Sequence, residues 1–240
     1  MRLDLFLLKK NLLENRTRAV YFIKSGKIKV NDLIEKKPSF KVSEKDQIEL
    51  IPPTIYVSKG GYKLESFMKE TGINVKGKTI LDIGCSTGGF AHYFITDGAK
   101  KVIAVDIADN ILSPKLSKNK NLDHYSLFDA TKKENIKKIL KKEKMDIISI
   151  DISDQSIRNI LTILPQFLKR KGKIIALFKP HYEGKKGIVP QKDKEKLAKE
   201  FEKWLTKNTP LKIITKRESS ERGGFNLKGN KEIFYWIEFK

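Results

Sequence analysis

A short apolar segment that runs into a glycine-rich loop constrains the fold of this chain more than any other feature. Ile80-Leu81-Asp82-Ile83 is followed by Gly84-Cys85-Ser86-Thr87-Gly88-Gly89-Phe90. An apolar run that ends in glycines is typical of a buried parallel strand that opens into a turn and a helix. Glycines in such a loop let the backbone approach a ligand where a Cβ atom would collide. We therefore predict an α/β fold with a ligand site at the carboxyl end of this strand.

A second apolar run, 102–105, ends in Asp106, about twenty residues further on. A carboxylate at the tip of a neighbouring strand can accept both hydroxyls of an adenosine ribose, so the pocket is expected to bind a nucleoside cofactor. The loop departs from G-x-G-x-x-G, and Asp82 would repel a pyrophosphate but not the cations of S-adenosylmethionine. The pattern therefore favours S-adenosylmethionine over a dinucleotide. The alternative is a tight turn that binds no ligand, and the acidic residue Asp106 at the tip of the neighbouring strand disfavours this alternative.

Strand and helix patterns alternate beyond residue 77, which predicts a parallel sheet. The expected strands are 79–83, 101–106, a short strand leading to 127–129, 145–151, 172–178, 211–216 and 232–239, and the expected helices are 62–71, one from about Phe90, 132–144, 154–169 and 191–207. Before them, two helical patterns that end at Gly26 and two extended segments, 27–31 and 46–51, indicate a small α+β unit. Pro52-Pro53 interrupts regular structure. We predict a first domain over 1–51, a linker over 52–57 and a second domain over 58–240.

The charge of the chain points to a polyanionic partner. There are 50 Lys and Arg residues against 29 Asp and Glu, a net charge of +21. Nucleic acid is the first expectation and an anionic membrane surface the second, while a lysine-rich but merely solvated surface is the alternative. A single cysteine, Cys85, is typical of a reducing cytoplasm. The three histidines show no metal-ligand spacing, no segment approaches the ~20 apolar residues of a membrane span, and the N-terminus is unlike a secretory signal.

Lysines and acids are expected to meet at the ligand edge of the sheet. Asp151 and Lys179 follow predicted strands, Lys63 lies in the preceding helix, and Glu232 begins a last strand that would run antiparallel. Methylation of a ribose 2′-hydroxyl requires a base, because a free hydroxyl is a poor nucleophile. A lysine can serve if burial and a second ammonium lower its pKa. We expect Lys179 to be this base, with Lys63 lowering its pKa and Asp151 orienting it.

The first 51 residues resemble the S4 RNA-binding domain. The matching segments are Arg2-Leu3-Asp4 with Leu8, then Asn15-Arg16-Thr17-Arg18-Ala19, and Ile23-Lys24-Ser25-Gly26-Lys27-Ile28-Lys29-Val30-Asn31. Basic side chains at its helix-to-strand corner can contact RNA phosphates by shape. The predicted RNA-binding residues are Arg2, Arg16, Arg18, Lys24, Lys27, Lys29 and, from the second domain, Lys59. A generic basic helical hairpin with a small sheet is the alternative.

Residues 58–240 resemble the TlyA family, called hemolysins in older usage, whose catalytic domain is of the FtsJ methyltransferase type. The matching motifs are 58–64 (SKGGYKL), 82–90 (DIGCSTGGF), 151–153 (DIS), 179–183 (KPHYE) and 229–233 (GNKEI). The resemblance implies a Rossmann-like class I methyltransferase sheet and a catalytic tetrad of Lys63, Asp151, Lys179 and Glu232. The predicted cofactor-binding residues are Asp82, Gly84, Ser86, Thr87, Gly88, Gly89, Phe90, Asp106, Ile107, Asp129 and Asp151. His181 stands where the family usually has glutamine.

The resemblance implies S-adenosylmethionine-dependent 2′-O-methylation of a cytidine in large- or small-subunit ribosomal RNA, in the cytoplasm. Ribosomal RNA or ribosomal subunits are the expected partners, and neither a metal nor a membrane is expected. Two other functions remain as hypotheses. One is an RNA- or ribosome-binding protein without catalysis, against which the intact tetrad speaks. The other is a membrane-active hemolysin, which would be expected to show a spanning segment or a strongly apolar amphipathic helix.

Overall fold

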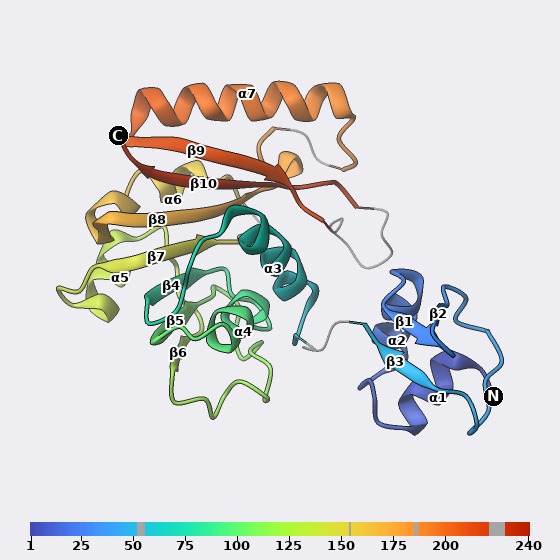
Figure 1. Ribbon diagram of the computed structural model, residues 1–240. Coiled ribbons are helices and arrows are strands. Elements are labelled where there is room, and N and C mark those ends of the chain that lie inside the picture. The colour runs from blue at the N-terminus through green and yellow to red at the C-terminus, as the bar shows by residue number, and fades with distance from the viewer. Residues whose placement is uncertain (52–55, 154, 185–186, 221–228) are drawn as a thin grey trace. The chain divides into compact units, whose positions relative to one another are not determined.

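The computed structural model describes residues 1–51, 56–153, 155–184, 187–220 and 229–240 (Figure 1). The chain forms two compact units, Met1–Ile55 and Tyr56–Lys240. Residues 52–55 of the predicted linker lie outside the described residues, whereas Tyr56 is 3% exposed and packs edge-on against Tyr62 of the second unit. The second unit thus begins within the segment that we predicted as linker.

The first unit contains two helices and a three-stranded antiparallel sheet. Helices α1 (Leu3–Lys9) and α2 (Arg16–Lys24) accompany strands β1 (Ile28–Val30), β2 (Leu33–Ile34) and β3 (Ile48–Leu50), in the order β2-β1-β3. The Asn15 side chain caps α2 by accepting from the Arg18 backbone N–H. Helix α1 is shorter than its apolar pattern predicts, because Asn11 adopts a left-handed conformation with φ of 54°. The predicted small α+β unit is confirmed.

The second unit is built on a seven-stranded sheet. Its strands are β4 (Thr79–Ile83), β5 (Lys101–Val105), β6 (Leu122–Tyr125), β7 (Met145–Ile150), β8 (Leu168–Phe178), β9 (Leu211–Glu218) and β10 (Ile233–Phe239). Their order is β6-β5-β4-β7-β8-β10-β9, and β10 runs antiparallel to both of its neighbours while the other pairs are parallel. The Rossmann-like methyltransferase sheet with a reversed last strand is confirmed.

Helices cover both faces of this sheet (Figure 1). They are α3 (Lys59–Thr71), α4 (Gly89–Thr96), α5 (Lys133–Leu140), α6 (Arg158–Leu161) and α7 (Gln191–Asn208), with 3₁₀ turns η1 (Leu164–Phe167) and η2 (Pro180–Tyr182). On one face, Phe67 of α3 and Phe90 of α4 stack against Phe234 of β10. On the other, residues of α5, α6 and α7 share one apolar core with the strands. The sheet is thereby buried and its carboxyl edge is left to carry polar groups.

Several predicted boundaries are wrong, among them the end of the helix 132–144, which is α5 and ends at Leu140, and the start of the strand 172–178, which is β8 and begins at Leu168. The expected helix over 154–169 is instead the short α6 followed by η1, since Pro165 lies at the start of η1 and Leu168 already pairs with Met145 in the sheet. The third strand, β6, ends at Tyr125 and leads to 127–129 as predicted, and Leu127, with a φ of 52°, has already left strand geometry. Helix α3 begins at Lys59 rather than Tyr62, so Lys63 is not in its first turn.

Candidate active site

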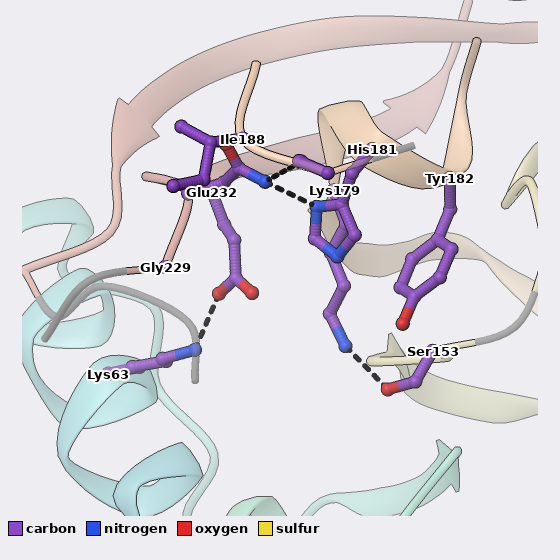
Figure 2. A pocket seen from close by; sticks show the side chains of 10 residues that line it. Lys63, Ser153, Lys179, His181, Tyr182, Ile188, Gly229 and Glu232 are labelled. Atoms are coloured by element: carbon purple, nitrogen blue, oxygen red, sulfur yellow. Dashed lines mark hydrogen bonds and ion pairs between the residues drawn. The ribbon is translucent and has the colours of Figure 1, made fainter. Parts of the chain in front are cut away.

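The four predicted catalytic side chains form two ion pairs at one edge of the sheet, and Figure 2 shows three of them, Lys63, Glu232 and Lys179. Lys63 projects from α3 and its Nζ lies 2.5 Å from Oε2 of Glu232, which directly precedes β10. Lys179 directly follows β8, and its Nζ lies 2.6 Å from Oδ1 of Asp151, which directly follows β7. Lys63, Lys179 and Glu232 are each at most 9% exposed. The structure thus brings together residues from four separate segments.

Three of these side chains, Lys63, Lys179 and Glu232, line a pocket of about 480 Å³. Its walls comprise Lys63, Ser153, Lys179, His181, Tyr182, Gly187, Ile188, Gly229, Asn230 and Glu232. The volume is in the range of ordinary ligand pockets, which suits a nucleoside-sized group. Polar and charged atoms converge on one side of it, where the two ammonium groups and the Glu232 carboxylate lie (Figure 2). A substrate hydroxyl placed there would meet both donors and acceptors.

The electrostatic setting of Lys179 differs from our expectation. Burial lowers its pKa, but the carboxylates of Asp151 and Glu232 raise it by more, and the net direction is upward. The ammonium of Lys63, expected to lower this pKa, is itself paired with Glu232. The expected lowering is therefore wrong for the free protein. Lys179 is held in its charged form, donating to Ser153 Oγ at 2.9 Å as well as pairing with Asp151.

Seven pocket residues were missing from our predicted site residues, and three of them, Ser153, His181 and Asn230, form hydrogen bonds through their side chains. Ser153 accepts a hydrogen bond from Lys179, and Asn230 joins the 187–189 segment to His181. All three belong to the motifs at 151–153, 179–183 and 229–233, and their place in these motifs was the sequence feature that could have identified them as site residues. Their contacts could not be assigned because the partners lie 26 to 49 residues apart in the chain.

The glycines of the predicted cofactor loop make room for protein atoms. A Cβ on Gly84, whose φ is +79°, would lie 2.7 Å from the Asp151 carbonyl oxygen. A Cβ on Gly88, with φ of +90°, would lie 2.5 Å from Leu116, and one on Gly89 would lie 2.1 Å from Ser58. Such contacts are too short for carbon, so these positions require glycine for packing of the loop itself. Our expectation that they serve ligand approach gains no support from these contacts.

The predicted cofactor residues divide into exposed and buried groups. Ser86 and Ile107 are exposed and Thr87 is half-buried, whereas Gly88, Gly89 and Phe90 are buried. Phe90 is part of the aromatic stack on β10. Asp82 is fully buried, and its Oδ1 accepts from Ser149 Oγ at 2.6 Å. Burial, opposed by that hydrogen bond, raises the pKa of Asp82 to about 7. Asp82 therefore lies beneath the loop and has no surface for a ligand, contrary to our prediction of direct contact.

Asp106 ties the loop to the neighbouring strand. Its Oδ2 accepts from the Ser86 backbone N–H at 2.7 Å and its Oδ1 from Ala108 N–H at 2.9 Å. Each carboxylate oxygen has a second lone pair, so ribose hydroxyls can still be accepted. Ile107, the next residue in the chain, is 56% exposed, and Leu127, which is 72% exposed, lies on the segment whose N–H groups donate to Ala108 O and Asp106 O. A half-buried acid near exposed apolar groups fits the ribose and base of a nucleoside cofactor.

Asp129 comes after the next strand, β6, and is half-buried. Its Oδ1 accepts from both the backbone N–H and the hydroxyl of Thr131, and these bonds lower its pKa, against the raising effect of burial. Cys85 is buried, which raises the pKa of its thiol, so it is a packing residue rather than a nucleophile. Among the described residues, no three His, Cys, Asp or Glu side chains are grouped as metal ligands, and no helix is long and apolar enough to cross a membrane.

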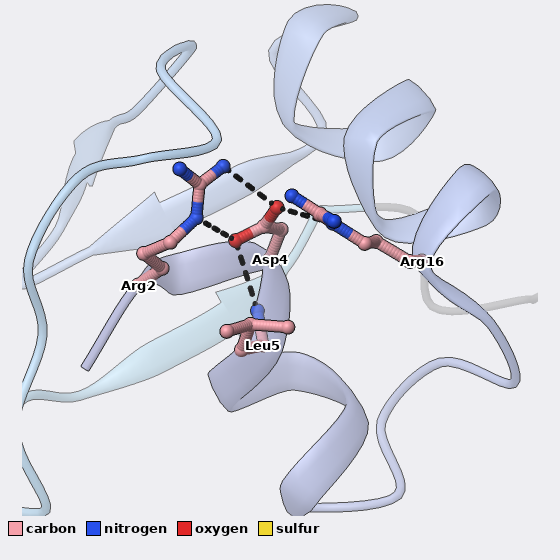
Figure 3. A network of polar contacts seen from close by, with 4 residues as sticks. All are labelled: Arg2, Asp4, Leu5 and Arg16. Atoms are coloured by element: carbon pink, nitrogen blue, oxygen red, sulfur yellow. Dashed lines mark hydrogen bonds and ion pairs between the residues drawn. The ribbon is translucent and has the colours of Figure 1, made fainter.

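In the first unit, a buried acid organises two of the predicted RNA-binding arginines (Figure 3). Asp4 is 0% exposed and accepts two hydrogen bonds from Arg2 and one from Arg16 Nε. These bonds, opposed by burial, lower its pKa to about 2. The side chains of Arg2 and Arg16 remain 37% and 60% exposed, so their other N–H groups are available to a partner.

The other predicted RNA-binding residues have varied settings. Lys24 is exposed, Lys29 pairs with Glu49 at 2.9 Å, and the Lys27 ammonium lies 5.2 Å from the centre of the Tyr21 ring. Arg18 lies 3.6 Å from Glu14, and its guanidinium lies 5.8 Å from the centre of the Phe22 ring. Lys59 belongs to α3 of the second unit, so it is not part of this cluster.

Comparison with known proteins agrees with both units. Residues 1–48 match the S4 domain model, and residues 56–220 match the model of the FtsJ-like methyltransferases. Hemolysin A of Brachyspira hyodysenteriae is 35% identical over 189 residues, which cover 79% of this chain and 78% of that protein. The 23S rRNA (cytidine-2′-O)-methyltransferase TlyA of Campylobacter jejuni is 33% identical over 198 residues, 76% of this chain and 70% of that protein.

A solved structure described as a hemolysin from Streptococcus thermophilus extends the match to the whole chain. It has a TM-score of 0.71 and 27% identity, covering 100% of this chain and 88% of that one. The fold, the two domain matches and these relatives agree with one another. The chain therefore belongs to the TlyA group of the FtsJ-like methyltransferase family and carries an S4 domain at its N-terminal side.

Proposed function

We propose that this protein transfers a methyl group from S-adenosylmethionine to the ribose 2′-hydroxyl of a cytidine in ribosomal RNA. The name of the Campylobacter relative specifies this reaction on 23S rRNA. A relative in Mycobacterium tuberculosis, named a 16S/23S rRNA (cytidine-2′-O)-methyltransferase, is 28% identical over 190 residues. One observation of this chain carries the proposal: the four tetrad side chains form two ion pairs, and Lys63, Lys179 and Glu232 are buried at the wall of one pocket.

Lys179 is the proposed acceptor of the hydroxyl proton. Its ammonium donates a hydrogen bond to Ser153 and forms an ion pair with Asp151, and these two contacts hold it at the wall of the pocket. Only the neutral amine can take a proton, so the lysine must first release one to solvent. Because the pKa of Lys179 is raised in the free protein, the neutral fraction and hence the rate should increase with pH through the neutral range.

The second ion pair has a positioning role in this proposal. Glu232 and Lys63 lie on the opposite wall of the pocket from Ser153 (Figure 2). A buried carboxylate paired with an ammonium can accept from a substrate hydroxyl while the ammonium holds the carboxylate in place. Correct alignment of a hydroxyl with a methyl donor accounts for a large part of such catalysis.

The cofactor is proposed to bind along the 84–88 loop, with Asp106 at its ribose and Asp129 near its adenine. S-adenosylmethionine supplies the methyl group as an electrophile when it is bound. Acids at this edge, Asp106 and Asp151, suit a ligand that carries positive charge. Rigid packing at Gly84 and Gly88 holds the loop in one conformation for that contact.

The S4 unit is proposed to bind the RNA. The exposed N–H groups of Arg2 and Arg16 are held in a fixed orientation by Asp4, which favours bidentate contact with phosphate. Phosphate contacts position the substrate, whereas the choice of nucleotide is left to the pocket.

The test is single-turnover methyl transfer to ribosomal subunits from a strain that lacks this gene. Lys179→Ala and Lys179→Arg should both abolish transfer, because a guanidinium cannot lose its proton at neutral pH. Cofactor binding by calorimetry and the intrinsic tryptophan emission of the folded state serve as controls. A Lys179→Arg protein with near-normal rates would exclude a lysine base. Binding of subunits without any transfer by the unaltered protein would instead favour the non-catalytic RNA-binding alternative.

An Asp151→Asn variant separates the effect of Asp151 on the orientation of Lys179 from its effect on the pKa of Lys179. Removal of the carboxylate charge takes away a cause that raises the pKa of Lys179. The rising limb of the pH–rate profile should therefore move to lower pH even though the maximal rate falls with the lost orientation. An unmoved limb would show that Lys179 does not titrate in the reaction.

A further inference from the structure

The side chain of Asn230 is fixed in one orientation by backbone groups of known polarity. Its Oδ1 accepts from the Val189 N–H at 2.7 Å, and its Nδ2 donates to the Gly187 carbonyl oxygen at 2.8 Å. A backbone N–H can only donate and a carbonyl can only accept. A flipped amide would place like groups against each other at both contacts, so the orientation is unambiguous.

This orientation determines which nitrogen of His181 carries the proton. Nδ2 of Asn230 also lies 3.1 Å from Nδ1 of His181 (Figure 2). Because Nδ2 has only N–H groups to offer, Nδ1 must be the acceptor and is unprotonated. The neutral imidazole then carries its proton on Nε2. Burial lowers the pKa of His181, the ammonium groups of Lys179 and Lys63 act in the same direction, and Glu232 opposes them.

The protonated nitrogen faces the reacting groups. Nε2 points to the side of the pocket on which the Lys179 ammonium lies (Figure 2). The Tyr182 ring lies beside that of His181, with 4.2 Å between the ring centres, while Ile188 lies on the Glu232 side of the pocket and is 77% exposed although it lines the pocket (Figure 2). Besides the tetrad groups, the pocket therefore offers a neutral donor on His181, the aromatic ring of Tyr182 and the exposed aliphatic side chain of Ile188.

We infer that His181 is a specificity-determining residue that donates from Nε2 to N3 of a cytosine held in this pocket. The inference rests on the proposed function, since it assigns the base of the same nucleotide. A neutral donor with flanking apolar surface suits a nucleobase, which is recognised in RNA through its hydrogen-bonding edge and its flat face. A phosphate would favour a cationic side chain. Cytosine presents two adjacent acceptors at O2 and N3, whereas uracil presents a donor at N3 and meets the His181 donor unfavourably.

The tautomer can be tested without any activity. Nitrogen-detected spectra of the full-length protein labelled with ¹⁵N-histidine report which ring nitrogen is protonated, and His181→Gln identifies the His181 signal among the three histidines. The Nε2–H form is expected, and Asn230→Ala should convert it to a mixture of tautomers. An Nδ1–H form in the unaltered protein would overturn the inference.

Base selection is tested with subunits from the gene-deletion strain that carry either cytidine or uridine at the mapped target position. The ratio of kcat/KM for cytidine over uridine is the readout. His181→Phe keeps a ring of similar size without a donor, and it should reduce this ratio by about tenfold, the scale of one unmade hydrogen bond. His181→Gln, which restores an N–H donor, should recover most of the ratio. Asn230→Ala should lower it to an intermediate value, because Asn230 acts by positioning His181.

These outcomes separate the inference from the function on which it rests. Absence of transfer by the unaltered protein contradicts the proposed function. Transfer that proceeds with an unchanged ratio in His181→Phe contradicts the inference alone. A fall in rate that is equal for cytidine and uridine would indicate a structural role for His181 and would also overturn the inference.

Discussion

The buried pair of Lys63 and Glu232 yields a prediction that distinguishes a role of the pair in methyl transfer from a role in the free energy of unfolding. The two groups are 2.5 Å apart, with side chains 9% and 4% exposed. Removal of one partner from a buried pair leaves an uncompensated charge and typically costs about 3–5 kcal/mol. Replacement of both partners by apolar side chains of similar size is often neutral or stabilising. Lys63→Met and Glu232→Gln should therefore each destabilise the second unit strongly, whereas Lys63→Met combined with Glu232→Leu should not.

Urea unfolding followed by tryptophan fluorescence measures this directly. Both tryptophans of the chain, Trp204 on α7 and Trp236 on β10, belong to the second unit, so the emission reports on that unit. A loss of about 3–5 kcal/mol lowers the urea midpoint by roughly 1–2 M. Lys101→Met is a matched control, because Lys101 and Asp123 are 2.7 Å apart but 35% and 43% exposed. An exposed pair contributes only about 0.2–1 kcal/mol.

The double variant carries the decisive comparison. We expect it to unfold at or above the unaltered midpoint and yet to transfer no methyl group, which would show that the pair is retained for the reaction. If either single variant is no less stable than Lys101→Met, the pair is not desolvated as the structure indicates. If the double variant is as unstable as the single ones, packing rather than unpaired charge explains the losses, and the reasoning is refuted.

Three further predictions concern the cofactor, the RNA and the S4 unit. Asp106→Ala should weaken S-adenosylmethionine binding by about 1–3 kcal/mol in calorimetry, with the exposed Asp109→Ala as control, and an unchanged affinity would contradict the proposed pocket. Arg16→Glu should weaken binding to ribosomal subunits and flatten its salt dependence while S-adenosylmethionine affinity stays the same; unaffected RNA affinity would exclude this docking surface. The pKa of Asp4, lowered to about 2, contributes stability that is present above the unfolded value near 4 and is lost as the pH falls through 2. Circular dichroism of the acid transition should show this loss, and Asp4→Asn should remove that part of the pH dependence.

Local pattern was sufficient for the elements that form the frame of the second unit. The apolar runs at 79–83 and 101–105 coincide with β4 and β5, because a buried strand must be apolar on both faces. The motif at 229–233 and the reversed β10 were likewise accessible from the resemblance. The predicted helix over 154–169 failed, since its apolar residues are buried in α6, η1 and the start of β8, and periodicity does not distinguish these from one helix.

Contacts between distant segments decided the chemistry of the pocket. Glu232 is 169 residues from Lys63, and only the fold shows that their charges pair, leaving Asp151 and Glu232 to set the pKa of Lys179 above its usual range. The sequence by itself determined which titratable groups reach the carboxyl edge of the sheet, because strand ends are encoded locally. The tertiary structure alone decided the proton on His181 and the burial of Asp82, because both depend on which partner atoms pack within a few ångströms.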